Sequence, residues 1–216
     1  MTGRTGTLRI GLTGGIASGK SSAAALFAAR GAPIIDTDLV ARFVVRPGSD
    51  GLAAVFETFG AEARAPDGTL DRAALARRIF SDSGERQRLE EILHPRIRSE
   101  IRNRLRCVDA PYVVVVVPLL VETGMDADVD WVVVVDLDPA AQRLRLQHRE
   151  GLSSAETASR LAAQASRVQR LARADFTLDN RGNPHELVGQ VASLHRHFLA
   201  RQCDAPPGRR RRGRSR

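Results

Sequence analysis

Short runs of β-branched apolar residues recur along the chain and predict five strands. The clearest are YVVVVV at residues 112–117 and WVVVVD at residues 131–136, which show no polar alternation. Runs of this kind are typical of strands that are buried on both faces of a parallel sheet. Weaker runs lie at residues 7–13, 32–36 and 176–178. The pattern therefore predicts a parallel sheet assembled from segments that are distant in sequence.

Helical segments separate these strands. The first helix is expected at residues 20–30, and two later helices open with proline, at residues 139–149 and 184–201. The fixed φ of proline suits the first turn of a helix. Strands that alternate with helices predict an α/β fold with three layers around a five-stranded parallel sheet.

The interval between the second and third strands is too long for a simple crossover. Four helices are expected within it, at residues 39–45, 51–59, 70–80 and 85–107. An insertion of this size is a usual place for a substrate-specific element on a generic scaffold. A second, arginine-bearing excursion at residues 151–173 begins with a capping-box pattern, Ser153 to Glu156. These boundaries assign a core to residues 1–38, 108–150 and 174–202, a helical domain to residues 39–107, a helical excursion to residues 151–173 and a tail to residues 203–216.

The turn after the first strand carries a phosphate-binding pattern. Its sequence is Gly14-Gly15-Ile16-Ala17-Ser18-Gly19-Lys20-Ser21, which matches G-x-x-x-x-G-K-S/T between a strand and a helix. Glycines let backbone N–H groups close around phosphate oxygens, and the helix adds its positive N-terminal end. Lys20, the only lysine of the chain, is placed to reach the β- and γ-phosphates, and the Ser21 hydroxyl is placed to ligate Mg²⁺. We therefore expect an ATP site with magnesium; a guanine-reading Asn-Lys-x-Asp element is excluded because it needs a second lysine.

Two carboxylates are expected beside this loop. The run at residues 112–117 ends in proline and leucines rather than an acid, so the acidic partner must come from elsewhere. Asp36 and Asp38 follow the second strand, and the carboxyl ends of neighbouring parallel strands converge on one crevice. Such a pair can orient magnesium and take a proton from an acceptor hydroxyl. Asp38 as the N-cap of a helix beginning at Leu39 is an alternative role that can coexist with this one.

One helical stripe offers cations for phosphoryl transfer. Gln142, Arg145 and Arg149 share one face of the helix expected at residues 139–149, and the stripe leads into the excursion at residues 151–173. Phosphoryl transfer needs cations around the migrating group and a lid that excludes water. A solvated amphipathic surface explains the same spacing, and both interpretations stay open.

Composition and charge limit the other classes of function. The longest apolar stretch, residues 112–121, has ten residues with a proline inside, and the N-terminus is polar, so neither a membrane helix nor a secretory signal is expected. Cys107, expected to be buried, and Cys203 form no disulfide or zinc pattern, which favours a cytoplasmic location.

The excess positive charge lies at the C-terminus. Six arginines within residues 209–216 supply most of the net charge of +8, which falls to +2 without them. We expect a disordered tail with at most weak attraction to nucleic acid. A polyanion-binding protein with a regulatory ATP site is the alternative from another class, and it rests on this tail alone.

Several short motifs, taken in order, resemble the dephospho-coenzyme A kinase family. The resemblance extends from residue 8 to residue 199 and leaves only the tail unmatched. The motifs that carry it are Gly11-Leu12-Thr13-Gly14-Gly15-Ile16, Asp36-Thr37-Asp38, Leu93-His94-Pro95, Pro118-Leu119-Leu120-Val121-Glu122, Gln164, Ala174-Asp175 and Asn180-Arg181-Gly182. Arg170 departs from the family, which often has lysine there, and Ala17 replaces a common glycine.

This resemblance implies a nucleotide-kinase fold in which the helical domain binds the acceptor and the excursion forms a lid. It implies that Mg·ATP phosphorylates the ribose 3′-hydroxyl of dephospho-CoA, the last step of coenzyme A synthesis. Asp38 then resembles the catalytic base, Asp36 its support, and Arg145 the charge-stabilising arginine. The implied ATP contacts beyond the loop are Ser22, Arg149 and Asn180, and the implied acceptor contacts are Asp38, His94, Pro118, Leu119 and Glu122.

Some alternatives remain open at this point. His94 precedes a proline and can instead mark a break in the helix between Leu93 and Arg96. The acceptor can be another small alcohol, such as a nucleoside monophosphate or a sugar, because only the family resemblance identifies it. The partners expected are ATP and dephospho-CoA, with no membrane, and the chain is expected to be a monomer or a weak homo-oligomer.

Overall fold

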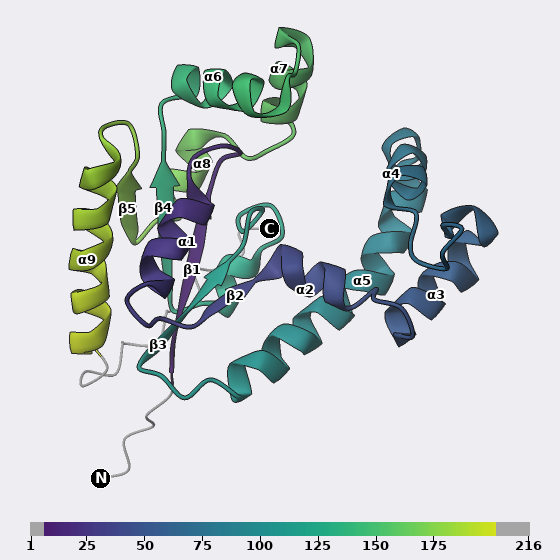
Figure 1. The fold of residues 1–216 in the computed structure, drawn as a ribbon, viewed down its shortest axis with the longest axis horizontal. Helices are drawn as coiled ribbons and strands as arrows, with labels where there is room; N and C mark the ends of the chain where they lie inside the picture. Colours follow the sequence, from purple (N-terminus) through teal and green to yellow (C-terminus); the bar gives the residue numbers. More distant parts are fainter. Residues whose placement is uncertain (1–6, 202–216) are drawn as a thin grey trace, which may run out of the picture. The chain divides into compact units, whose positions relative to one another are not determined.

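A computed structural model describes residues 7–201 of the chain, which forms two compact units (Figure 1). Among the described residues, the first unit, called the sheet unit here, comprises 7–36 and 108–201, and the second, the helical unit, comprises Thr37–Cys107. The expected tail at residues 203–216 and Cys203 lie outside the described residues. None of the helices between residues 7 and 201 is long and apolar enough to cross a membrane.

The sheet unit is built on five parallel strands in the order β2-β3-β1-β4-β5. The strands are β1 (Leu8–Gly14), β2 (Ile34–Asp36), β3 (Tyr112–Val116), β4 (Trp131–Asp136) and β5 (Phe176–Asp179). All five predicted strands are present, and each lies within two residues of its predicted bounds. The predicted α/β fold with a five-stranded parallel sheet is therefore confirmed.

Both faces of the sheet are buried, which explains the unbroken valine runs. On one face, Val114 and Val133 pack in a core with Phe27 of α1 (Lys20–Ala28) and Phe198 of α9 (Pro184–Arg201). Alternate residues such as Val113, Val115, Val132 and Val134 are also buried. The space around Gly11 is too small for a side chain, because a Cβ there would lie 2.8 Å from Leu120 Cδ1 and 3.0 Å from Val129 Cγ2. The segment after β3 therefore packs against this strand residue.

Tyr112, the only tyrosine of the chain, provides a test of this core. Its phenol Oη lies 2.7 Å from His195 Nδ1, and burial raises the pKa of Tyr112 from 10.0 to about 12. A raised pKa in the folded state means that its stabilising contribution is intact below pH 10 and is lost as the pH rises towards 12.

We expect ultraviolet titration of the native protein to give a tyrosinate midpoint about 12, against a value near 10 in urea. The urea-unfolded chain is the control, because it has the same tyrosine without its burial. A native midpoint that equals the unfolded one would contradict the buried phenol.

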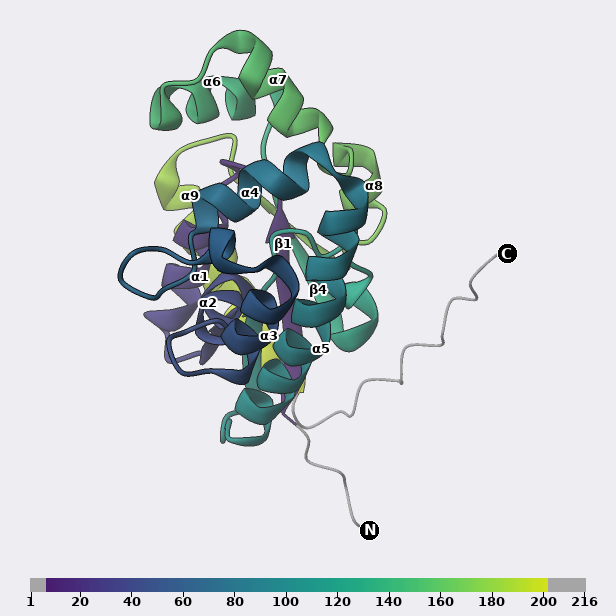
Figure 2. The same ribbon diagram turned by 90° about the vertical axis from the view of Figure 1, so that its right-hand side faces the viewer.

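Three further α-helices of the sheet unit lie beyond the carboxyl ends of β1 and β4 (Figures 1 and 2). They are α6 (Pro139–Glu150), α7 (Ser154–Ala162) and α8 (Arg167–Leu171). The predicted capping box of Ser153 and Glu156 is present at the start of α7. A second capping box at the start of α8, formed by Ser166 and Gln169, was not predicted.

The helical unit contains α2 (Thr37–Phe43), α3 (Asp50–Phe59), the 3-10 turn η1 (Ala61–Ala63), α4 (Arg72–Ser81) and α5 (Ser83–Arg106). Helix α2 begins directly after β2, so Asp38 lies inside its first turn; the predicted start at Leu39, and with it the N-cap role, is wrong. An acidic residue in the first turn still interacts favourably with the helix dipole.

The helix predicted at residues 85–107 is present as α5, but two other interpretations of this segment are wrong. The helix continues through Pro95, so the alternative of a break at His94 does not hold. In the same turn, Arg96 Nη1 donates a hydrogen bond to the carbonyl of Ile92 at 2.7 Å. Cys107 is exposed rather than buried, since it forms the C-cap of α5.

Candidate active site

The phosphate loop connects β1 to α1 and has the backbone geometry that its glycines permit. Gly19 has a φ of 99°, and a Cβ there would lie 2.2 Å from Asn180 Nδ2. At Gly14 a Cβ would lie 2.5 Å from the carbonyl oxygen of Val135. Gly19 is the N-cap of α1 and has no side chain to accept bonds from the first turn. The first N–H groups of α1 thus meet no side chain of their own cap, which suits an anion.

Lys20 folds back over the loop that precedes it. Its Nζ donates hydrogen bonds to the carbonyl oxygens of Gly14, at 2.8 Å, and Gly15, at 3.0 Å. The only ammonium side chain of the protein is therefore held at the entrance of the loop. A bound triphosphate would meet this charge at the end of the loop nearest β1.

Two glutamines hold the middle of the loop. The N–H of Ile16 donates to Gln164 Oε1 at 2.9 Å, and the carbonyl of Ile16 accepts from Gln142 Nε2 at 2.7 Å. Gln142 comes from α6 and is 5% exposed, whereas Gln164 follows α7. A Cβ at Gly15 would lie 2.3 Å from Gln142 Nε2. The loop conformation therefore depends on side chains that are far away in sequence.

We expect Gln142→Leu to lower the free energy of unfolding by about 1 kcal/mol, because the Ile16 carbonyl loses its donor. The measurement is urea unfolding followed by the fluorescence of Trp131, the only tryptophan. Gln147→Leu, on the same helix, is the matched control; among residues 7–201 its amide has one hydrogen bond, to the Ser154 hydroxyl at 3.1 Å. That control should change stability by less than about 0.5 kcal/mol. Equal effects of the two substitutions would contradict a specific role of Gln142.

A second chain of contacts joins α6, the end of β5 and the loop. Asn180 Nδ2 donates to the Ser18 carbonyl at 2.7 Å, and Arg145 Nη2 donates to the Asn180 carbonyl at 3.2 Å. Two predicted site residues, Arg145 and Asn180, are thus brought to the loop. Arg149, the last member of the predicted stripe, is ion-paired with Glu150.

The segment after β3 also reaches the excursion. Glu122 Oε1 accepts a hydrogen bond from the backbone N–H of Ala165 at 2.7 Å. The Pro118 carbonyl accepts from Thr13 Oγ1 at 3.4 Å, at the end of β1, and Leu119 is 42% exposed. Of the expected acceptor residues, these three lie in the sheet unit near the carboxyl ends of its strands.

The two expected acids lie in different units. Asp36 ends β2 opposite Val116 and is half-buried, at the carboxyl edge of the sheet that also carries the phosphate loop. Asp38 is exposed in the first turn of α2, in the helical unit, and His94 is exposed on α5 of the same unit.

An ion pair that the sequence did not indicate ties α8 to the sheet. Arg167 donates from Nε to Asp136 Oδ1 at 2.8 Å and from Nη2 to Asp136 Oδ2 at 2.6 Å. This contact raises the pKa of Arg167, and Asp136 is only 7% exposed at the end of β4. The signal that was available is the acid that ends the second valine run, followed by arginines at positions 167, 170 and 173.

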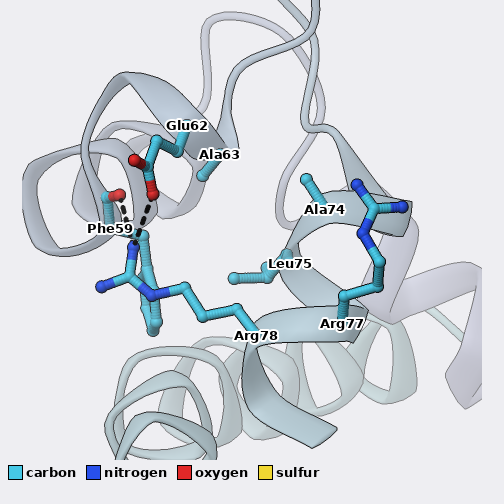
Figure 3. A pocket seen from close by; sticks show the side chains of 7 residues that line it. All are labelled: Phe59, Glu62, Ala63, Ala74, Leu75, Arg77 and Arg78. Carbon is cyan, nitrogen blue, oxygen red and sulfur yellow. Dashed lines mark hydrogen bonds and ion pairs between the residues drawn. The ribbon is translucent and has the colours of Figure 1, made fainter. Parts of the chain in front are cut away.

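The helical unit contains a cavity of about 340 Å³ between α3, η1 and α4 (Figure 3). It is lined by Phe59, Glu62, Ala63, Ala74, Leu75, Arg77 and Arg78. Arg78 donates to the Phe59 carbonyl at 3.0 Å and to Glu85 Oε1 at 2.7 Å, so its charge is balanced by a neighbouring carboxylate. None of the lining residues belongs to the phosphate loop, and this cavity is therefore not the ATP site.

Comparisons with known proteins connect this site to a reaction. The sequence model of one protein family, described as dephospho-CoA kinase, matches residues 8–186. A dephospho-CoA kinase of Anaeromyxobacter dehalogenans (strain 2CP-C) is 48% identical over 207 residues, which cover 93% of this chain and 98% of the relative. Another from Sodalis glossinidius (strain morsitans) is 46% identical over 196 residues, 91% of this chain and 94% of the relative.

A solved structure shares the fold of this chain. A protein from Thermus thermophilus superposes with a TM-score of 0.79 at 31% identity, covering 90% of this chain and 98% of its own. The residues that the family model matches, 8–186, include the phosphate loop, the five strands and the helical insertion.

Proposed function

We propose that this chain, which belongs to the dephospho-CoA kinase family, transfers the γ-phosphoryl group of ATP to the ribose 3′-hydroxyl of dephospho-CoA. This reaction is the last step of coenzyme A biosynthesis. The observation that carries the proposal is the phosphate loop with the Lys20 ammonium bound over its first two residues, in a chain whose residues 8–186 match the family.

The phosphate loop provides most of the contacts to ATP, the phosphoryl donor. Residues 14–22 surround the phosphates with backbone N–H groups, and the Lys20 ammonium exchanges its bonds to Gly14 and Gly15 for bonds to the β- and γ-phosphates. Arg145, already attached to the Asn180 carbonyl, adds charge near the migrating group, and Arg149 and Asn180 complete the ATP contacts. Little covalent chemistry is required of the protein, so positioning and electrostatics account for most of the rate enhancement.

Magnesium fits the donors of this site. Within residues 7–201 there is no group of three or more His, Cys, Asp or Glu side chains that could hold a metal. Mg²⁺ often binds through few protein groups, retaining waters and substrate phosphates as its other ligands. The Ser21 hydroxyl, in the first turn of α1, is the protein ligand that we assign to it. When bound, the ion neutralises charge on the β- and γ-phosphates.

The acceptor is activated by the acidic pair. Asp38 takes the proton of the 3′-hydroxyl as general base, and Asp36 supports it. His94 on α5 and the segment containing Pro118, Leu119 and Glu122 contact dephospho-CoA. The helical unit binds the acceptor, and the segment at residues 151–173 acts as the lid. The protein acts in the cytoplasm, as a monomer or a weak homo-oligomer.

A coupled ADP-release assay tests this proposal. Dephospho-CoA is compared with AMP, adenosine and gluconate as acceptors at equal concentration and saturating Mg·ATP. We expect acceptor-dependent ADP release with dephospho-CoA alone among the four. Faster release with any other acceptor would overturn the proposed substrate while leaving the kinase chemistry intact.

A further inference from the structure

Arg170 is a buried cation with little compensation inside the protein. It lies on α8 and is 9% exposed, and its Nη1 donates to the carbonyl of Ala165. Two carboxylates act on its charge: Asp136 accepts hydrogen bonds from Nε and Nη2 of Arg167, and Glu122 accepts one from the Ala165 N–H. Within residues 7–201, Arg170 therefore forms no ion pair. Burial lowers the pKa of Arg170, and the nearby charges of Glu122 and Asp136 oppose this shift only in part.

The guanidinium of Arg170 lies against the phosphate loop. Its Nη2 would be 2.9 Å from a Cβ placed on Gly15, the residue whose carbonyl accepts from the Lys20 ammonium at 3.0 Å. Gly15 is therefore in contact with both cations. Since Lys20 of this motif reaches the β- and γ-phosphates, the Gly15 end of the loop is the end at which the terminal phosphate binds.

We propose that Arg170 is a second cation for the terminal phosphoryl group of bound ATP, an inference that rests on the proposed function. The buried guanidinium has donors left over after its bond to Ala165, and a planar fork of this kind suits phosphate oxygens. An unpaired buried charge is costly, and the incoming anion compensates it. The charge of Arg170 thus favours the nucleotide that carries a γ-phosphate.

The consequence is a preference for ATP over ADP that Arg170 supplies. If Arg170 served only in packing, its loss would weaken the binding of both nucleotides, because loss of packing alters the whole loop. If Arg170 instead binds the γ-phosphate, its loss weakens the binding of ATP alone. The free protein should also tolerate an apolar side chain there, since a buried cation without a partner does not stabilise it.

The test compares Arg170→Met with Arg167→Met, two substitutions on one helix. Calorimetry gives the Kd of each variant for Mg·ATP and Mg·ADP, and thermal unfolding gives the Tm without nucleotide. For Arg170→Met we expect the Kd for ATP to rise at least about tenfold and that for ADP to change by less than about threefold, with no decrease in Tm. Arg167→Met leaves Asp136 buried without its partner, so its Tm should fall.

Arg170→Lys provides a second variant that keeps the charge as a point rather than a fork. It should weaken the binding of ATP less than Arg170→Met does, again with little change in the Kd for ADP. Equal weakening of both nucleotides, together with a lower Tm, would overturn the inference, as would unchanged ATP binding in Arg170→Met. Failure of the proposed function is recognised separately, because the unsubstituted protein would then bind ATP but not phosphorylate dephospho-CoA.

Discussion

Lys20→Ala is expected to lower kcat/KM for ATP by about a thousandfold, which corresponds to about 4 kcal/mol of transition-state stabilisation. The physical reason is that the ammonium over Gly14 and Gly15 lies where charge accumulates on the β- and γ-phosphates. Because Lys20 is the only lysine of the chain, no other ammonium side chain can replace it. The measurement is steady-state kinetics with dephospho-CoA as acceptor.

The control for this experiment is Lys20→Arg, which retains the charge in a larger planar group. It should recover part of the lost activity, and both variants should unfold at close to the original Tm, since Lys20 is only partly buried. Near-normal turnover by a folded Lys20→Ala protein would show that the triphosphate does not bind in this loop.

Asp38→Asn is expected to reduce kcat by about 10² to 10⁴ while the Kd for ATP stays nearly constant. Asparagine keeps the size of the side chain but cannot accept the proton of the 3′-hydroxyl. Asp38 is exposed in the first turn of α2, so the substitution should not change the fold. Pre-steady-state or steady-state turnover with saturating ATP measures kcat, and calorimetry measures the Kd for ATP.

Asp36→Asn is the matched comparison for Asp38→Asn, because Asp36 lies two positions earlier at the end of β2. With Asp38 as the base, Asp36→Asn should retain more activity than Asp38→Asn does. A loss of Mg·ATP binding in Asp38→Asn, with kcat preserved at saturation, would instead assign the carboxylate to the metal and contradict its role as base.

Much of the fold was predictable because its signals are local. The valine runs of β3 and β4 need burial on both faces, and proline at position 184 begins α9 as expected. Helix α5 shows the limit of such signals. The pattern of residues 85–107 predicted one helix, but the local rule for proline left a break at His94 as an alternative, and the helix runs through Pro95 without that break.

In the candidate active site, too, the features that are local in sequence were predictable and those that depend on distant residues were not. The phosphate loop is contiguous in sequence, and its pattern alone indicated the glycines, Lys20 and Ser21. The side chains that shape it come from far away: Gln142 is 126 residues from Ile16 and Gln164 is 148 residues from it. The burial of Arg170 and the Asp136–Arg167 pair likewise exist only once α8 has packed against β4. Roles assigned to Asp38, His94 and the other contacts remain predictions for the experiments above.

The most direct test follows the phosphoryl group itself. The protein is incubated with dephospho-CoA and ATP labelled in its γ-phosphate, and the position of the label is determined by mass spectrometry and NMR. The account predicts that the label appears as a 3′-phosphate on the ribose of coenzyme A, and that Lys20→Ala nearly abolishes it. Label found only in inorganic phosphate, or at another position of the acceptor, would contradict it.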